Sequence, residues 1–180
     1  GDPTRARDAL ELGLHACAGS DRTARHRRAR LLLTAGSVDQ ADGLHERALS
    51  QHTRARELAL EIGEVHLAAS ASANCGTIAL DRGDLGAAQR ELRTAGAALI
   101  ALGRDRDAGR TLANLANLSS LIGDEDAVAL QLDAAHAAAT RAGDAHCLGP
   151  RSLLGGDVEL RRGLVAQAPP SAAARDPSSP

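Results

Sequence analysis

Three asparagines are the residues of this sequence whose type and spacing best suit binding chemistry. Asn74, Asn114 and Asn117 are its only asparagines, and all three fall in helix-length segments, although Asn is usually favoured in turns. Asn74 and Asn114 are forty residues apart, and Asn117 follows one helical turn after Asn114. A side-chain amide offers both a donor and an acceptor, so this chemistry suits hydrogen bonds to a peptide bond.

Further polar side chains share the predicted face. Arg110 lies one turn before Asn114, and its guanidinium can hold a carboxylate through two parallel hydrogen bonds. Thr77 and Ser70 fall on the matching face of the preceding segment. An alternative interpretation is that these groups only join helices to one another or lie on a solvated surface. The candidate ligand-binding site consists of Asn74, Thr77, Arg110, Asn114 and Asn117.

The segments that position these residues repeat every forty residues. Glycines form two series with this spacing, and between them Leu92 aligns with Leu132 and Ala95 with Ala135. Glycine at fixed intervals between helix-length segments is typical of a stacked array of helical hairpins. The two series are Gly63, Gly103 and Gly143, and Gly83, Gly123 and Gly163.

The sequence predicts about eight helices. The first begins at Pro3, with Asp2 as its N-cap, and ends near Cys17. Four regular helices are predicted over residues 65–82, 85–102, 106–122 and 125–142, with Asp105 as the cap of the third of these. Because Gly149 and Pro150 interrupt the next segment, the eighth helix is predicted from residue 150 to about 162.

The first full hairpin can be read in two registers. Strict forty-residue spacing places its turn at Gly43, whereas Ser37 and Gln40 have the spacing of a capping box that begins a helix after Gly36. We expect the turn at Gly36, between helices over residues 21–35 and 37–63. Gly43 then lies inside the second helix, at a cost of about 1 kcal/mol relative to Ala.

These hairpins resemble tetratricopeptide repeats, in the forty-residue form found in bacterial regulators, over about residues 1–165. The family has a small residue where the two helices of a hairpin cross, and a small, bulky, small pattern in the second helix. The crossing residues are Gly76, Ala116 and Gly156. The second helices contribute Ala88, Leu92 and Ala95, then Val128, Leu132 and Ala135, and Ala41, His45 and Ala48 fit the pattern in the first full hairpin. Ala79 and Ser119 stand where the family commonly has Tyr.

The resemblance implies an all-α, right-handed α-solenoid of antiparallel helical hairpins. It also implies that the first helix of each pair lines a concave groove, where Asn side chains hydrogen-bond the backbone of an extended peptide. The implied function is a non-catalytic protein- or peptide-binding scaffold, as the interaction or sensor arm of a larger bacterial regulatory protein. The alternative is a structural spacer or self-association segment that has no ligand of its own.

Composition predicts where the repeat domain ends and which compartment the chain occupies. Residues 166–180 are rich in Pro, Ser and Ala, so we expect a disordered tail after a repeat domain of residues 1–165. Cys17, Cys75 and Cys147 are odd in number and widely spaced, without a signal peptide, which favours a reduced, cytoplasmic setting. No apolar stretch is long enough to span a bilayer.

Several classes of function find no support in the residues. All 21 basic residues are Arg and the net charge is −2, so the basic run over residues 22–30 does not indicate nucleic-acid binding. The seven His and three Cys lack the spacing of zinc frameworks. We find no phosphate-binding loop, nucleophile elbow or Ser–His–Asp arrangement. We therefore expect no enzymatic activity, no metal and no cofactor.

Overall fold

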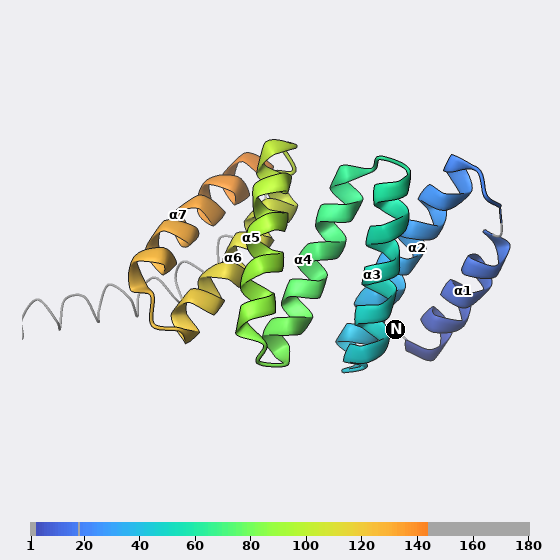
Figure 1. Ribbon diagram of the computed structural model, residues 1–180, viewed down its shortest axis with the longest axis horizontal. Coiled ribbons are helices and arrows are strands. Elements are labelled where there is room, and N and C mark those ends of the chain that lie inside the picture. Colours follow the sequence, from blue (N-terminus) through green and yellow to red (C-terminus); the bar gives the residue numbers. More distant parts are fainter. Residues whose placement is uncertain (1–2, 18, 144–180) are drawn as a thin grey trace, which may run out of the picture.

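The chain forms a row of antiparallel helices. A computed structural model describes residues 3–17 and 19–143, and this part of the chain is helical with short connections (Figure 1). Its seven helices are α1 (Pro3–Ala16), α2 (Arg22–Ala41), α3 (His45–Glu61), α4 (Val65–Asp81), α5 (Leu85–Ala101), α6 (Asp105–Leu121) and α7 (Glu125–Ala142). The eighth helix predicted over 150–162 and the tail predicted over 166–180 lie outside the described residues.

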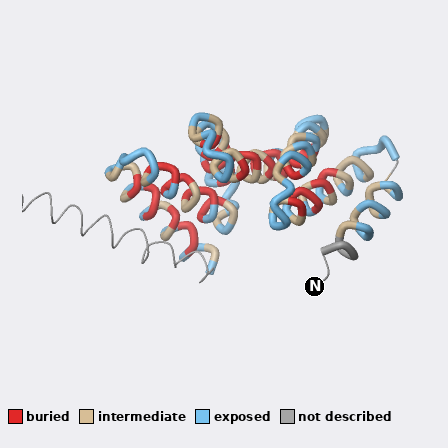
Figure 2. The backbone as a smooth tube through the Cα atoms, turned by 90° about the horizontal axis from the view of Figure 1, so that it is seen from below, coloured by how far each residue is buried: buried red, intermediate tan, exposed pale blue. Residues whose placement is uncertain are grey.

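Consecutive helices pair into hairpins, and the hairpins stack in chain order. The three hairpins are α2–α3, α4–α5 and α6–α7, while α1 packs against α2 at one end of the row. The first helices of the hairpins also contact one another, α2 with α4 and α4 with α6. The row bends into an arch, with buried residues concentrated where the helices face each other (Figure 2). The predicted all-α solenoid of antiparallel hairpins is therefore confirmed.

The glycine spacing comes from the turns that end the helices. Six glycines have φ between 63° and 77°, a left-handed conformation that costs other residues roughly 1–2 kcal/mol. They recur every twenty residues, as Gly43, Gly63, Gly83, Gly103, Gly123 and Gly143. After two of these turns an aspartate caps the next helix, because Asp84 accepts from the Ala87 amide at 2.9 Å and Asp124 from the Ala127 amide at 3.0 Å.

The predicted turn at Gly36 is wrong, and the turn lies at Gly43. Helix α2 continues through Gly36, and at this residue it packs against the His52 ring of α3. A Cβ at Gly36 would lie 2.5 Å from His52 Cε1, so only glycine allows this approach. Ser37 does not cap a helix; its hydroxyl donates to the Leu33 carbonyl one turn earlier in α2, at 3.0 Å.

Two smaller predictions change with this register. The small, bulky, small pattern of the first hairpin consists of Ala48, His52 and Ala55, which are all buried, in place of Ala41, His45 and Ala48. Asp105 does not cap α6 but lies in its first turn, and the cap position is occupied by Arg104 without a side-chain hydrogen bond.

In the core, small residues on one helix of a hairpin leave space for bulky residues on the other. Gly76 of α4 faces Leu92 of α5 so closely that an added Cβ would lie 2.8 Å from Leu92 Cγ. In the next hairpin Ala116 packs with Leu132, which is 3% exposed. Cys75 is also buried, as expected for a residue that takes a core position.

An ion-pair cluster joins α1 to the first hairpin. Asp39 of α2 is fully buried, at the register position that Ala79 and Ser119 occupy in later hairpins. Its carboxylate lies 3.3 Å from Arg7 Nε of α1 and 3.2 Å from Arg47 Nε of α3. Because a buried carboxylate needs compensating charge, Asp39 ties these three helices together.

Candidate functional site

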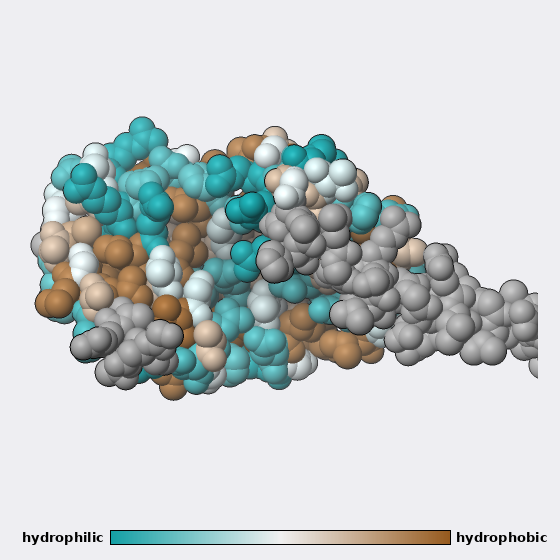
Figure 3. All heavy atoms as spheres, turned by 180° about the vertical axis from the view of Figure 1, so that it is seen from behind, coloured by the Kyte–Doolittle hydropathy of each residue, from teal (hydrophilic) through white to brown (hydrophobic). Residues whose placement is uncertain are grey.

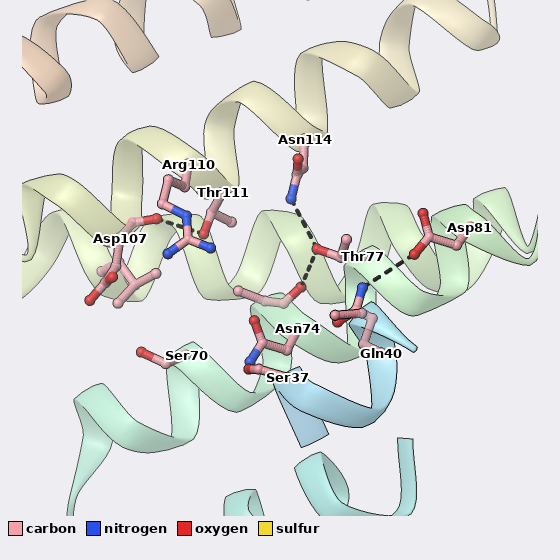
Figure 4. Close-up of a pocket in the computed structure, with 13 residues that line it drawn as sticks. Ser37, Gln40, Ser70, Asn74, Thr77, Asp81, Asp107, Arg110, Thr111 and Asn114 are labelled. Carbon is pink, nitrogen blue, oxygen red and sulfur yellow. Dashed lines mark hydrogen bonds between the residues drawn. The ribbon is translucent and has the colours of Figure 1, made fainter. Parts of the chain in front are cut away.

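The inner side of the arch carries a polar pocket of about 460 Å³. Its walls come mainly from α2, α4 and α6, the first helices of the three hairpins (Figure 4). Hydrophilic side chains also gather over the middle of the face seen in Figure 3. The polar lining residues are Ser37, Gln40, Ser70, Asn74, Thr77, Asp81, Asp107, Arg110, Thr111 and Asn114.

Four of the five residues predicted as the site line this one pocket. Asn74 and Thr77 come from α4, and Arg110 and Asn114 from α6. Asn117 is exposed on α6 and does not line the pocket. The repeat register brings the four together, because equivalent positions of neighbouring first helices face the same side of the stack.

A hydrogen-bond relay fixes the amide of Asn114. The Thr77 hydroxyl donates to the Ala73 carbonyl at 3.0 Å, so its oxygen accepts from Asn114 Nδ2 at 2.9 Å (Figure 4). This bond joins α6 to α4. The nitrogen of the Asn114 amide therefore links two helices, which is the alternative role considered for these polar residues. Asn114 Oδ1 has no hydrogen-bond partner among the described residues. The relay therefore leaves the carbonyl oxygen available to a ligand donor.

Asn74 is positioned by a histidine that sequence reasoning did not include in the site. Asn74 Nδ2 lies 3.5 Å from Nδ1 of His52, which is fully buried in α3. Burial lowers the pKa of His52 to about 4, so its imidazole is neutral at neutral pH. His52 Nε2 has no hydrogen-bond partner in the described part of the chain. The available signal was the register, since His52 stands where the later hairpins have Leu92 and Leu132.

The pocket carries charges of both signs. Arg110 is exposed, and its guanidinium forms no ion pair with any residue that the structure describes. Asp81, near the C-terminal end of α4, accepts from Gln40 Nε2 at 3.2 Å. Asp107 Oδ2 lies 4.0 Å from Arg104 Nε, at the edge of ion-pair distance. A ligand would therefore meet both Arg110 and Asp107 in the N-terminal half of α6, and Asp81 at the C-terminal end of α4.

The basic run at the start of α2 is partly neutralised by the neighbouring α3–α4 connection. Arg22 Nη2 and His26 Nδ1 each lie 3.6 Å from Glu64 Oε1. Arg25 Nη1 lies 3.4 Å from Glu61 Oε2. Two arginines and one histidine of the run thus face carboxylates at the end of α3 and the start of α4.

Other chemistry is sparse in the part of the chain that the structure describes. Within residues 3–17 and 19–143, no three His, Cys, Asp or Glu side chains are grouped as metal ligands. Cys17 and Cys75 are free thiols, and Cys147 lies outside this range. None of the described helices is long and apolar enough to cross a membrane.

Fold and pocket together define a helical-repeat protein with a polar inner face. Among solved structures, the apo form of RapI superposes with a TM-score of 0.70 at 17% identity, over 91% of this chain and 59% of that one. A Rap protein complexed with Competence and Sporulation Factor superposes with a TM-score of 0.67 at 22% identity, over 81% of this chain and 39% of that one.

At these identities the likeness concerns the fold, which is that of a helical-repeat solenoid. This chain spans less than two thirds of the length of either Rap structure. The sequence matches no known protein family and no curated protein.

Proposed function

We propose that this chain is a non-catalytic scaffold that binds a protein or an extended peptide along the inner face of its arch. The observation that carries the proposal is the pair of equivalent asparagines, Asn74 and Asn114, held in one pocket by framework hydrogen bonds. One structural neighbour was solved in complex with Competence and Sporulation Factor, which supports a binding role for this fold. The chain would act as the interaction or sensor arm of a larger bacterial regulatory protein in the cytoplasm.

The asparagines suit an extended backbone because their spacing matches its repeat. Packed helices lie about 8–10 Å apart, and an extended chain rises about 3.3 Å per residue. Asn74 and Asn114, on neighbouring helices, would therefore meet peptide groups about three residues apart. Asn114 Oδ1 would accept from a ligand N–H, while Arg110 would hold a carboxylate of the partner.

The alternative function, self-association, rests on a different observation. Leu12 on α1 and Leu130 on α7 are each 72% exposed, and these helices are the first and last of the described row. Apolar side chains at the two ends of a stack suit end-to-end contact between copies. Sedimentation of the free chain separates this role from groove binding, because an end contact leaves the pocket open.

Replacing both groove asparagines should weaken partner binding about tenfold, because two hydrogen bonds of about 0.5–1.5 kcal/mol each are lost. Extended peptides selected from a displayed random library on the wild-type chain would be titrated by calorimetry into Asn74→Ala/Asn114→Ala. Thr94→Ala, which changes an exposed polar residue of α5, serves as the control and should bind like wild type. The circular dichroism melt should show that both variants are folded. Equal affinity for the wild type and the folded double variant would refute the groove asparagines as ligand contacts.

A further inference from the structure

The repeat register places two arginines at equivalent positions on either side of Ser70. Ser70 of α4 and Arg110 of α6 are forty residues apart and both line the pocket. Arg30 of α2 takes the same register position one hairpin earlier, and it is exposed. Arg30 does not itself line the pocket, but it lies two helical turns before Ser37 of the same helix, which does. The helical period therefore places Arg, Ser and Arg in one row on the faces of α2, α4 and α6 that carry the pocket.

These two arginines differ in their surroundings from Arg22 and Arg25 of the basic run at the start of α2. Arg22 and Arg25 face the carboxylates of Glu64 and Glu61, as described above. Neither the Arg30 nor the Arg110 guanidinium has an ion-pair partner among residues 3–17 and 19–143. Their positive charges therefore remain available to a ligand.

Carboxylates of the pocket do not cancel this row. Asp107 lines the pocket one helical turn before Arg110, and its Oδ2 lies 4.0 Å from Arg104 Nε. Asp81 lies eleven residues after Ser70 on α4, roughly 16 Å farther along the helix axis at 1.5 Å per residue. The two arginines of the row thus outnumber the one carboxylate beside them, Asp107, while Asp81 lies at the opposite edge of the pocket.

We propose that the partner in this groove is an acidic extended segment, with two carboxylates that meet Arg30 and Arg110. This proposal rests on the proposed function, since it names the chemistry of the same ligand. Two helix-to-helix steps of about 8–10 Å separate the arginines, which corresponds to about five or six residues of an extended chain. Guanidinium forks bind carboxylates in a bidentate manner, so both the charge and the spacing of the acidic residues are specified.

Synthetic peptides test the proposal directly. The probes are three fluorescein-labelled, ten-residue peptides of alternating Ser and Ala, amidated at the C-terminus, that carry two Glu, two Gln or two Lys five positions apart. Binding is followed by fluorescence anisotropy at low and at moderate salt. We expect the Glu peptide to bind the wild-type chain about tenfold more tightly than the Gln peptide at low salt, with a smaller difference at moderate salt.

Matched variants locate the effect. In Arg30→Gln/Arg110→Gln the preference for Glu over Gln should disappear, whereas Arg54→Gln/Arg93→Gln should keep it. The control pair makes the same change of charge at exposed positions of α3 and α5, the second helices of their hairpins. Equal binding of the Glu and Gln peptides, or a preference for the Lys peptide, would overturn the acidic partner. If the Gln peptide nevertheless binds, and its binding requires Asn74 and Asn114, the proposed function stands and only the acidic partner is refuted. If none of the three peptides binds, both proposals fail.

Discussion

Lowering the pH from 6.5 to 4 should cost this fold about 3 kcal/mol of stability through His52 alone. The imidazole is fully buried, and desolvation lowers its pKa in the folded chain from 6.5 to about 4. Between these two values the unfolded chain binds a proton at His52 and the folded chain does not. The free energy of unfolding is therefore unaffected above pH 6.5, falls by about 1.4 kcal/mol per pH unit below it, and levels off near pH 4.

Substitution of His52→Leu isolates this contribution from that of the carboxylates, which also titrate in acid. Leucine fits the site, because Leu92 packs against Gly76 in the next hairpin as His52 packs against Gly36. Urea unfolding of both proteins at several pH values between 7 and 4 gives the comparison. We expect the variant to lose about 3 kcal/mol less than the wild type over this range. Parallel stability curves for the two proteins would show that His52 titrates normally in the folded chain.

Gly36→Ala should destabilise the chain by about 2–3 kcal/mol, because the new methyl group overlaps the His52 ring. An added Cβ would lie 2.5 Å, 2.7 Å and 2.8 Å from three ring atoms, and the ring is enclosed on all sides. Gly96→Ala is the matched control, since its nearest neighbours would lie at 3.7 Å and 3.9 Å. There the loss of backbone freedom in the unfolded chain should make alanine neutral or stabilising by up to about 1 kcal/mol.

A double-mutant cycle tests whether the stability lost in Gly36→Ala comes from overlap with the His52 ring. In a His52→Ala background the same Gly36→Ala change should cost much less, with a coupling above about 1 kcal/mol in urea unfolding. Additive effects would mean that Gly36 is constrained by its backbone and not by the imidazole.

The forty-residue spacing predicted the later helices well because their ends are fixed by one recurring feature, a left-handed glycine. The predicted bounds of α4 to α7 agree with the structure to within one residue. The first hairpin failed because the Ser37–Gln40 capping box is a local signal, whereas the need for Gly36 comes from His52, sixteen residues away. A long-range contact of that kind overrides a local capping preference. The strict forty-residue register, which places the turn at Gly43, therefore predicted the hairpin correctly.

For the site, too, the features that follow from the repeat spacing were predicted, whereas contacts between side chains were not. Repeat spacing brought Asn74, Thr77, Arg110 and Asn114 into one pocket, since equivalent helical positions share a face. It did not show that Thr77 orients Asn114, because that hydrogen bond depends on how α4 and α6 pack.

The most direct test of groove binding uses the scarcity of asparagine. A chain labelled with ¹⁵N only at asparagine gives three pairs of side-chain amide signals, one pair for each asparagine, which the Asn74→Ala and Asn114→Ala variants assign. These signals would be followed during titration with a peptide selected on the wild-type chain. A ligand on the inner face should shift the Asn74 and Asn114 amide signals together and saturably, at one peptide per chain. Saturated binding that leaves both signals unmoved would place the ligand elsewhere and contradict the function proposed for this fold.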